Sequence, residues 1–297
     1  MGKGITRERT GYLLQELFKI LLENQDGISA RDAIEQLINR IELTVHEKGE
    51  YESGSRRFDK ILRFSTIDAV KAGWMRKNRG IWTITEEGAA ALQTTPNSDD
   101  FYREASRLYR KWKKLQIDEN SEIETIEEND QSLEAKVTFE EAEEQAWKEI
   151  SNYLIDIDPY DFQDLVAALL EAMDYHVSWV SPPGKDGGID ILAFNDPLGT
   201  VPPRIKVQVK RRKDNIAVEE MRSFLALINN DDVGIFVTTG GFTKDAEFLV
   251  RSQETRKVTL IDRQRLVDLW IEYNDKLEKD KRTLLPLKPI YFIAPNL

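Results

Sequence analysis

The stretch from Val233 to Val237 constrains the fold more than any other part of the chain. Apart from Gly234 its residues are all apolar, and polar residues bracket it on both sides. A run of this length and character is typical of a strand that is covered on both faces. Because such strands lie in the middle of sheets flanked by helices, the sequence predicts an α/β domain with three layers.

The residues around this strand alternate between helix and strand patterns. Apolar residues recur at helical spacing from Phe162 to Met173, which predicts a helix with one buried face. Tyr175, Val177 and Trp179 alternate with polar residues, which predicts a strand with one packed face. From residue 160 to residue 270 the expected order is helix, strand, strand, strand, helix, strand, helix, strand, helix.

Two clusters of polar residues lie at strand-like positions in this domain. The first is Gly187-Gly188-Ile189-Asp190, and the second is Ile205-Lys206-Val207-Gln208-Val209-Lys210. Since side chains alternate along a strand, Gln208 and Lys210 are expected on one face and the apolar residues of the second cluster on the other. If the two strands are neighbours, a carboxylate, an amide oxygen and an ammonium group converge on one place.

These side chains suit a divalent cation and the hydrolysis of a phosphodiester. Magnesium prefers hard oxygen ligands and keeps several waters, so Asp190 and Gln208 can hold it together with a substrate phosphate. Lys210 would orient the nucleophile or stabilise the transition state. Each cluster alone also fits a purely structural interpretation, as a turn that enters a strand or as the solvated face of an amphipathic strand.

Taken in order, these blocks resemble the catalytic domain of Mrr-like restriction endonucleases, within the PD-(D/E)xK nuclease superfamily. The resemblance implies an α/β fold with a restriction-endonuclease-like mixed sheet flanked by helices, and Mg²⁺-dependent cleavage of DNA. It rests on Asp161-Phe162-Gln163-Asp164-Leu165-Val166, Asp186-Gly187-Gly188-Ile189-Asp190, Val207-Gln208-Val209-Lys210, Gly234-Ile235-Phe236-Val237-Thr238-Thr239-Gly240 and Leu260-Ile261-Asp262.

Gln163 departs from the family pattern, in which a glutamate usually follows this phenylalanine. The resemblance makes this position a catalytic one. An amide can offer an oxygen to water on the metal but brings no negative charge, so chemistry with one metal ion is favoured. Asp161 and Asp164 flank the position, but helical geometry turns Asp164 about 100° and Asp161 about 160° away from it. Arg263, where the family usually has glycine, is interpreted as a local structural change.

Positive charge is concentrated around the second cluster. Six lysines and arginines fall between residues 204 and 213, with no acid among them. Such a patch is expected to follow the phosphates of DNA, although long basic side chains lying over apolar neighbours would give the same pattern. The candidate DNA-binding residues where this strand ends are Arg211, Arg212 and Lys213.

The first 95 residues follow a separate plan. Their pattern predicts helices at 6–23, 29–40 and 55–72, followed by a β-hairpin with a basic tip within 74–85. Three helices and a hairpin are the plan of a winged helix. The segment also resembles the N-terminal domain found in Mrr-like endonucleases, down to Trp82-Thr83-Ile84-Thr85-Glu86-Glu87-Gly88.

The third of these helices and the hairpin carry an excess of positive charge. Between residues 56 and 79, eight lysines and arginines stand against two aspartates. A recognition helix in the major groove and a hairpin on the DNA backbone would use this excess, whereas a protein-docking module is the alternative. The candidate DNA contacts are Arg57, Lys60 and Arg63 on the helix and Arg76, Lys77 and Arg79 on the hairpin.

Acidic residues are concentrated between the two domains. Residues 96–150 carry 8 basic and 16 acidic residues, whereas residues 1–95 carry 15 and 14. We therefore expect a winged-helix DNA-binding domain at 1–95, a helical acidic linker at 96–150 and the catalytic domain at 151–297. The first part of the linker either caps the winged helix or extends its DNA-contacting surface. The acidic part, 117–149, is expected to be a solvated linker or helix. A bolder hypothesis is that it occupies a basic groove in the absence of DNA and restrains the nuclease. Deleting 118–131 should then raise the cleavage of poor substrates.

The whole chain is expected to be a cytoplasmic DNA endonuclease. It has no cysteine, which excludes disulfides and fits a reducing interior, and it has neither a signal-like start nor an apolar run long enough to span a membrane. The resemblance implies Mg²⁺-dependent restriction of foreign or modified double-stranded DNA, including methylated sites. Because cutting both strands needs two active sites, a homo-oligomer is expected. The alternatives are a DNA-binding regulator with an inactive nuclease fold and a structure-specific repair nuclease.

Overall fold

The computed structural model describes residues 5–50, 56–119, 130–182, 184 and 187–290, and for 113–119 and 130–136 only the backbone is described. The chain forms two compact units, which divide between Trp147 and Lys148. Each unit has its own sheet and its own buried cluster of apolar residues. None of the helices described is both long enough and apolar enough to cross a lipid bilayer.

The first unit is a winged helix with additional helices. The sequence predicts its first three helices and its hairpin, and the structure confirms them; the short strand β1, which pairs with β3, has too few residues to leave a detectable pattern. In chain order the unit contains α1 (Arg7–Glu23), β1 (Ile28–Ser29), α2 (Ala30–Arg40), α3 (Arg57–Lys71), β2 (Met75–Asn78), β3 (Ile81–Ile84), α4 (Glu86–Thr94), α5 (Ser98–Glu119) and the part of α6 (Asp130–Asp156) that precedes Lys148.

Local signals in the sequence set the ends of these elements. Thr6, Ser29 and Thr85 are N-caps, and each hydroxyl accepts a hydrogen bond from the backbone N–H three residues further on. At the tip of the hairpin, Arg79 and Gly80 both have positive φ angles, of 48° and 77°. Two such residues in a row make the tight turn that matches the twist of the flanking strands. The left-handed region is unfavourable for a non-glycine residue such as Arg79.

Aromatic residues from separate elements form the core of the first unit. The rings of Phe18, Trp74 and Phe101 pack with centroids between 4.9 and 6.4 Å apart. Phe101 lies on α5, so this helix is part of the core, in agreement with its interpretation as a cap of the winged helix. Trp82 of the hairpin is also fully buried, as expected of a core residue.

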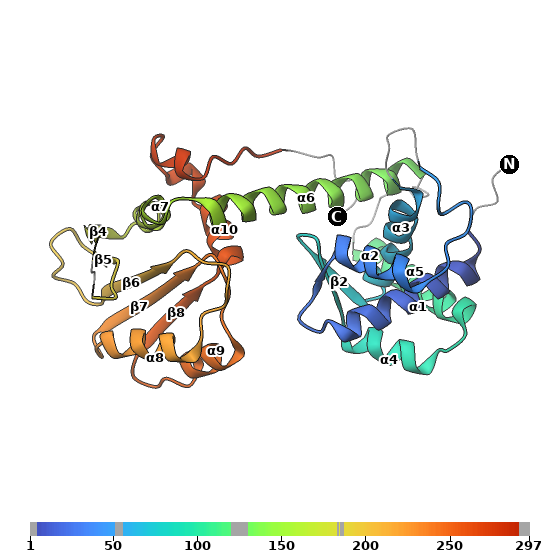
Figure 1. Cartoon of the computed structure of the whole chain (residues 1–297), viewed down its shortest axis with the longest axis horizontal. Helices are drawn as coiled ribbons and strands as arrows, with labels where there is room; N and C mark the ends of the chain where they lie inside the picture. Colours follow the sequence, from blue (N-terminus) through green and yellow to red (C-terminus); the bar gives the residue numbers. More distant parts are fainter. Residues whose placement is uncertain (1–4, 51–55, 120–129, 183, 185–186, 291–297) are drawn as a thin grey trace. The chain divides into compact units, whose positions relative to one another are not determined.

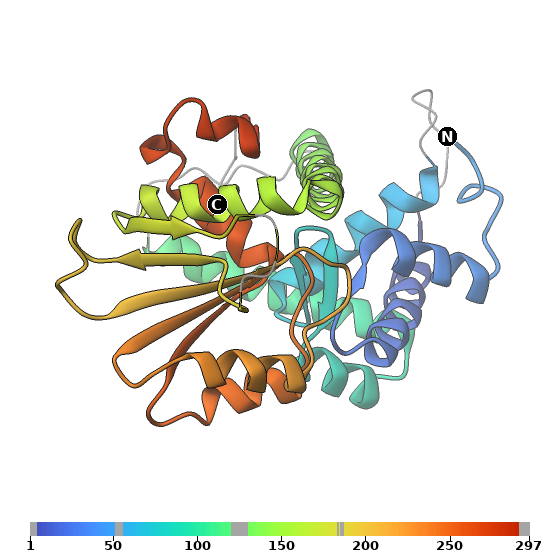
Figure 2. The ribbon, with the colours of Figure 1, turned by 60° about the vertical axis from the view of Figure 1, so that its left-hand side comes forward.

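The second unit is a five-stranded mixed sheet covered by helices on both faces. Its strands lie in the order β4-β5-β6-β7-β8; β5 is antiparallel to β4 and β6, and β7 is parallel to β6 and β8. Helices α7 and α10 lie along one face, and α8 and α9 along the other (Figures 1 and 2). The predicted order of elements is confirmed: α7 (Pro159–Ala172), β4 (His176–Val180), β5 (Ile191–Phe194), β6 (Arg204–Lys210), α8 (Val218–Leu227), β7 (Asp232–Thr238), α9 (Lys244–Arg251), β8 (Lys257–Ile261) and α10 (Arg263–Glu272), followed by the short η1 (Asn274–Lys276) and η2 (Lys281–Leu284).

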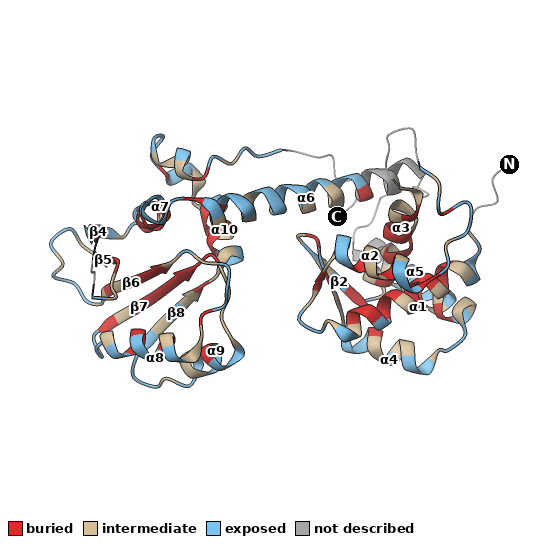
Figure 3. Ribbon diagram, in the orientation of Figure 1, coloured by how far each residue is buried: buried red, intermediate tan, exposed pale blue. Residues whose placement is uncertain are grey.

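Strands β6 and β7 form the buried middle of this sheet (Figure 3). Phe236 of β7 packs against Phe224 of α8, with ring centroids 5.2 Å apart. Gln208 is in register with Phe236 and therefore points to the same face. Gln208 is only 9% exposed, so the face of β6 that carries it is covered as well as the apolar face.

The edge strand β4 departs from the predicted alternation. Trp179 is 39% exposed, although its spacing from Val177 predicts that both residues pack against the core. The pairing of β4 with β5 shifts register between these two residues. Such a bulge rotates the side chains that follow it, and this rotation explains the exposed indole.

Candidate active site and nucleic-acid interface

The side chain of Asp190 is held by the backbone of β6. Ile191 of β5 lies opposite Val207 of β6, so continuing this antiparallel register places Asp190 opposite Gln208. The Asp190 N–H donates to the Val207 carbonyl at 2.8 Å. Its carboxylate Oδ2 accepts a hydrogen bond from the Val209 N–H at 2.6 Å. The Asp190 carboxylate thus accepts a hydrogen bond that a backbone carbonyl would accept in a regular strand pair. Asp190 lies beside β6 and is only 6% exposed.

The glycines before this aspartate bring the chain close to Gln208. Gly187 and Gly188 have φ angles of 66° and 88°, in the region that favours glycine. A Cβ on Gly188 would lie 3.6 Å from Gln208 Nε2 and 3.0 Å from Leu227 Cδ1. The positive φ angles therefore account for the two glycines, and the Gln208 amide lies near this loop. Asp186, which completes the motif, lies outside the described residues.

Lys210 ends β6 on the same face as Gln208. Its backbone carbonyl accepts hydrogen bonds from the Thr239 N–H at 3.2 Å and from Thr238 Oγ1 at 3.0 Å. Both threonines are completely buried at the end of β7. They fix the backbone that carries Lys210, a role that the sequence analysis did not assign. The available signal was a pair of hydroxyl residues directly after an apolar strand.

Gln163 lies on α7 and serves a structural purpose. Its Nε2 donates to the Ser181 carbonyl at 2.8 Å, and the Ser181 N–H donates to the Asp190 carbonyl at 2.8 Å. Ser181 therefore connects Gln163 to the backbone of Asp190. An ionised glutamate at position 163 has no N–H to donate, so the amide is matched to its surroundings in a way that the sequence alone does not reveal.

Asp190, Gln208 and Lys210 thus lie on the adjoining strands β5 and β6 and the residues next to them. Among the described residues, no group of three or more His, Cys, Asp or Glu side chains could hold a metal ion. The donor set beside β6 consists of one carboxylate and one amide oxygen. These hard oxygen ligands fit a magnesium ion that keeps several waters and also binds a substrate phosphate.

Two members of the basic patch are engaged within the fold. Arg204 and Lys206 both pair with Asp232, at 3.0 and 2.9 Å, and Asp232 is 4% exposed. Burial raises the pKa of Asp232, but the hydrogen bonds from Arg204, Lys206 and the Asn229 N–H lower it by more, to about 2. These two cations therefore join the first residues of β6 and β7.

The three candidate DNA contacts after β6 differ in their surroundings. Arg212 pairs with Glu220 of α8 at 2.8 Å, so its guanidinium stabilises the connection to that helix. Arg211 is exposed and donates to the Ile155 carbonyl at 2.6 Å. Lys213 is exposed. Arg211 and Lys213 therefore present charge to solvent, whereas Arg212 does so only in part.

The six candidate DNA contacts of the first unit also differ in exposure. Arg76, on the hairpin, is exposed, whereas Arg57 and Lys60, on α3, are half-buried. The other three contact α6: Arg63, Lys77 and Arg79.

Acidic residues of α6 pair with these cations. Arg63 bonds to Glu140 at 2.8 Å and to Glu144 at 2.6 Å, and Lys77 bonds to Glu140 at 2.7 Å. Burial lowers the pKa of Arg63, but the glutamates raise it by more, so the pKa lies above its ordinary value. Burial outweighs the glutamates at Lys77, whose pKa is lowered. This part of the acidic segment is therefore bound to the winged helix and is not a solvated linker.

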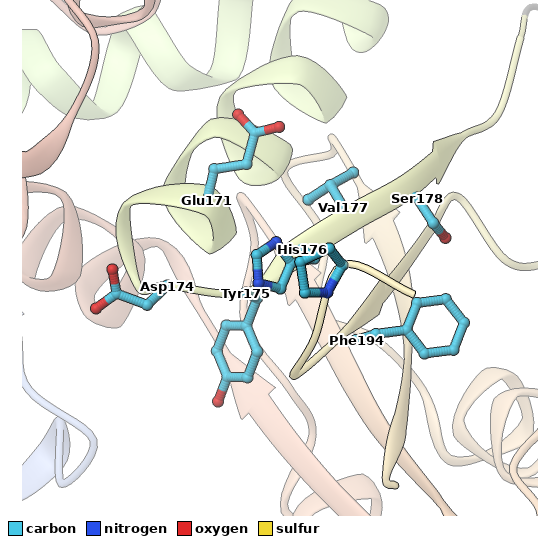
Figure 4. A pocket seen from close by; sticks show the side chains of 8 residues that line it. Glu171, Asp174, Tyr175, His176, Val177, Ser178 and Phe194 are labelled. Carbon is cyan, nitrogen blue, oxygen red and sulfur yellow. The ribbon is translucent and has the colours of Figure 1, made fainter. Parts of the chain in front are cut away.

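A cavity of about 550 Å³ opens elsewhere in the second unit, beside the edge strand β4 (Figure 4). Its lining includes Tyr175, His176 and Phe194. The residues that line it include none of the predicted catalytic residues. The cavity and the candidate active site are therefore separate places on the sheet.

Both units match known protein families. Residues 154–270 match the family described as restriction endonuclease, and residues 12–94 match the Mrr N-terminal domain. The chain is 23% identical over 279 residues to the type IV methyl-directed restriction enzyme EcoKMrr of Escherichia coli (strain K12). The aligned region covers 87% of this chain and 90% of that protein.

Two solved structures are also similar to this chain. The DNA modification-dependent restriction endonuclease AspBHI is 16% identical, with a TM-score of 0.36 over 47% of this chain and 38% of AspBHI. The MspJI restriction endonuclease in complex with a 27-mer oligonucleotide is 14% identical, with a TM-score of 0.30 over 70% of this chain and 52% of MspJI. The chain thus spans about half or less of the length of these two proteins.

Proposed function

The chain belongs to the Mrr family of restriction endonucleases, and from that membership we propose that it is a Mg²⁺-dependent endonuclease that hydrolyses phosphodiester bonds of double-stranded DNA. Its proposed substrate is foreign or modified DNA, including methylated sites. The description of EcoKMrr as methyl-directed supports this substrate class. Since each active site cuts one strand, the proposed working form on DNA is a homo-oligomer.

The observation that supports this proposal most directly is the 2.6 Å hydrogen bond from the Val209 N–H to Asp190 Oδ2. It keeps a buried carboxylate beside Gln208, and Lys210 follows on the same face of the strand. Burying a carboxylate is unfavourable unless other groups compensate its charge. A buried acid beside the strand that carries Gln208 therefore favours a role in binding a cation.

Each of these residues has a proposed role. Asp190 and Gln208 would hold Mg²⁺ through their oxygens, and the bound ion supplies charge neutralisation at the phosphate and lowers the pKa of the attacking water. Lys210 would orient the nucleophile and stabilise the negative charge that develops in the transition state. Gln163 would position the chain before Asp190 through Ser181.

The remaining parts of the chain would bind the DNA. The winged helix is the proposed reader of the duplex, through the candidate cations of α3 and the hairpin, while the nuclease unit would follow the phosphates. On this basis we propose a DNA-binding domain at 1–95 and a catalytic domain at 151–297. The candidates for phosphate contacts near the active site are Arg211, Arg212 and Lys213.

The direct test is a cleavage assay with the purified full chain, Mg²⁺ and matched methylated and unmethylated plasmids. Wild-type protein should convert supercoiled plasmid to nicked or linear forms only when Mg²⁺ is present. Asp190→Ala and Lys210→Ala should bind DNA nearly as before but fail to cut it. Lys213→Ala removes an exposed cation close to Lys210, and it should still cut when the protein saturates the DNA.

Gln163 favours a second candidate function, a DNA-binding regulator with an inactive nuclease fold. Its amide is committed to the Ser181 carbonyl at 2.8 Å and brings no negative charge to the site. Wild-type protein that binds duplex DNA but cuts neither plasmid at any Mg²⁺ concentration would support this regulator. Cleavage that is lost in Asp190→Ala would exclude it.

A further inference from the structure

The winged helix meets α6 with the surface that would face DNA. In DNA complexes of this fold the recognition helix enters the major groove, and the hairpin contacts the DNA backbone. Arg63 lies on α3, which follows two other helices as a recognition helix does, and Lys77 and Arg79 belong to the hairpin. All three contact α6 within the first unit, where α6 passes α3 (Figure 1).

Three glutamates on neighbouring turns of α6 make the contact. Glu140 and Glu144 are one helical turn apart, and Glu141 lies between them, so the three share one side of the helix. The guanidinium of Arg63 lies 2.8 Å from the carboxylate of Glu140, 2.6 Å from that of Glu144 and 3.7 Å from that of Glu141. Glu140 also pairs with Lys77 at 2.7 Å. We refer to Glu140, Glu141 and Glu144 as the acidic face.

The contact continues at the tip of the hairpin. The guanidinium of Arg79 lies 4.8 Å from the ring centroid of Trp147, which follows the acidic face along α6. This distance is that of a cation–π interaction. At the turn, a Cβ on Gly80 would lie 2.5 Å from Glu144 Cγ, so the helix rests directly on the hairpin.

The carboxylates of the acidic face make the bonds that DNA phosphates would make. Glu140 accepts hydrogen bonds from Arg63, from Lys77 and from Trp82 Nε1 at 3.2 Å. Guanidinium and ammonium groups bind carboxylate and phosphate oxygens in similar geometries, and the same N–H cannot serve both acceptors. Ion pairs that are partly buried add little stability compared with apolar packing. Such a contact is suited to exchange with another polyanion.

We propose that α6 is an internal competitor for DNA, and that the acidic face must leave the winged helix before Arg63 and Lys77 can contact a duplex. This inference rests on the proposed function, because it requires that the winged helix bind DNA. It gives α6 a regulatory role, because DNA and α6 cannot bind the side chains of Arg63 and Lys77 at the same time. If α6 is bound in about nine molecules of ten, its release should tighten apparent DNA binding about tenfold.

Neighbouring glutamates of α6 provide a matched pair of variants. Glu144→Gln removes one charge from the acidic face, and Glu143→Gln removes one charge from an exposed position beside it. We expect Glu144→Gln in the full chain to bind a fluorescent duplex about fivefold more tightly than wild type, in anisotropy titrations without Mg²⁺. Glu143→Gln should stay within about twofold of wild type, because its charge does not contact the winged helix. Equal affinities for the two variants would overturn the inference.

A disulfide offers a second test, because the chain contains no cysteine of its own. A Cβ on Gly80 would lie 3.0 Å from Glu144 Cβ, near the roughly 3.5–4.5 Å between the Cβ atoms of a disulfide. Gly80→Cys combined with Glu144→Cys should therefore attach α6 to the hairpin on oxidation. The oxidised protein should bind the duplex at least about tenfold more weakly than the same protein after reduction.

The oxidised and reduced forms of the double variant both carry a cysteine at position 80, where the φ angle is positive, so any backbone strain is common to both. Each form is therefore the control for the other. Equal DNA binding by both forms, with the disulfide verified by mass, would show that α6 does not compete. If wild type cuts DNA and neither test changes binding, α6 is a permanent part of the winged helix and only this inference fails. If wild type, Glu144→Gln and the reduced double variant neither bind nor cut DNA, the proposed function fails and the inference fails with it.

Discussion

The backbone N–H of Val209 donates a hydrogen bond of 2.6 Å to the side-chain carboxylate of Asp190. This bond extends the contact between β5 and β6 past the last paired residues of the ladder. It also sets a negative charge beside Gln208. The structural contribution of Asp190 requires only an acceptor oxygen, whereas the proposed metal-binding role requires charge as well, so the two can be separated by substitution.

Asp190→Asn should fold like wild type and lose DNA cleavage. The amide oxygen of asparagine can still accept the hydrogen bond from Val209, but the charge for Mg²⁺ is gone. We expect plasmid nicking to slow by about 10²–10³-fold, the range for losing one charge-stabilising group at an active site. Thermal unfolding should shift little. Asp231→Asn, an exposed acid, is the control for lost charge; full nicking by Asp190→Asn would rule out Asp190 as the metal ligand.

Gln163→Glu, which restores the residue usual in the family, should destabilise this protein. An ionised glutamate cannot donate to the Ser181 carbonyl, and it leaves that buried acceptor unsatisfied at a cost of about 1–3 kcal/mol. A protonated glutamate can donate the bond, so the folded state should raise the pKa of the new carboxyl. The stability that Gln163→Glu loses relative to wild type should therefore be small at pH values below the ordinary pKa of glutamate and should grow as pH rises. Urea unfolding at several pH values would measure it, and a deficit independent of pH would contradict this account.

Asp232 should make stability fall at acid pH. Its pKa is lowered to about 2 in the folded chain, against about 3.9 for an unfolded aspartate. Because the pKa of Asp232 is lower in the folded chain than in the unfolded chain, its carboxylate stabilises the fold at pH values above the unfolded pKa. That stabilisation is lost as pH falls from about 4 towards about 2. The shift corresponds to roughly 2–3 kcal/mol. Asp232→Asn should therefore be less stable than wild type at pH 6, and the difference should shrink towards pH 2; a constant difference in urea unfolding would argue against the ion pairs with Arg204 and Lys206.

Gly240→Ala should disturb the segment that follows Lys210. A Cβ at this position would lie 2.4 Å from the Asp214 carbonyl oxygen, a backbone atom that can move only with its whole segment. Overpacking of this kind costs about 1–3 kcal/mol, and nicking should fall with it. At Gly241→Ala the nearest atom is Asn215 Oδ1 at 2.7 Å, a side-chain atom that can rotate away. Thermal unfolding and nicking of the two variants should therefore differ; equal behaviour would show that the close approach at Gly240 is unimportant.

The order of elements in the nuclease unit follows from local patterns. Apolar periodicity reports which side of a helix or strand is buried, and this property is already present in a stretch of ten or so residues. The apolar run at 233–237 therefore predicts a buried strand, and the spacing of Gln208 and Lys210 predicts their shared face. The pairing of β5 with β6, on which the candidate site depends, agrees with the expectation that the strands bearing Asp190 and Lys210 are neighbours.

Contacts between distant residues had no such local signal. Gln163 finds its acceptor 18 positions away, and Arg63 finds Glu140 77 positions away. A run of acidic residues has the same sequence whether water or a basic surface surrounds it, because charge patterning records the sign of a segment and not its partner. The burial of Arg63 under α6 arises only when the folded chain brings opposite charges together, and that pairing changes the expected picture of an open DNA-binding surface.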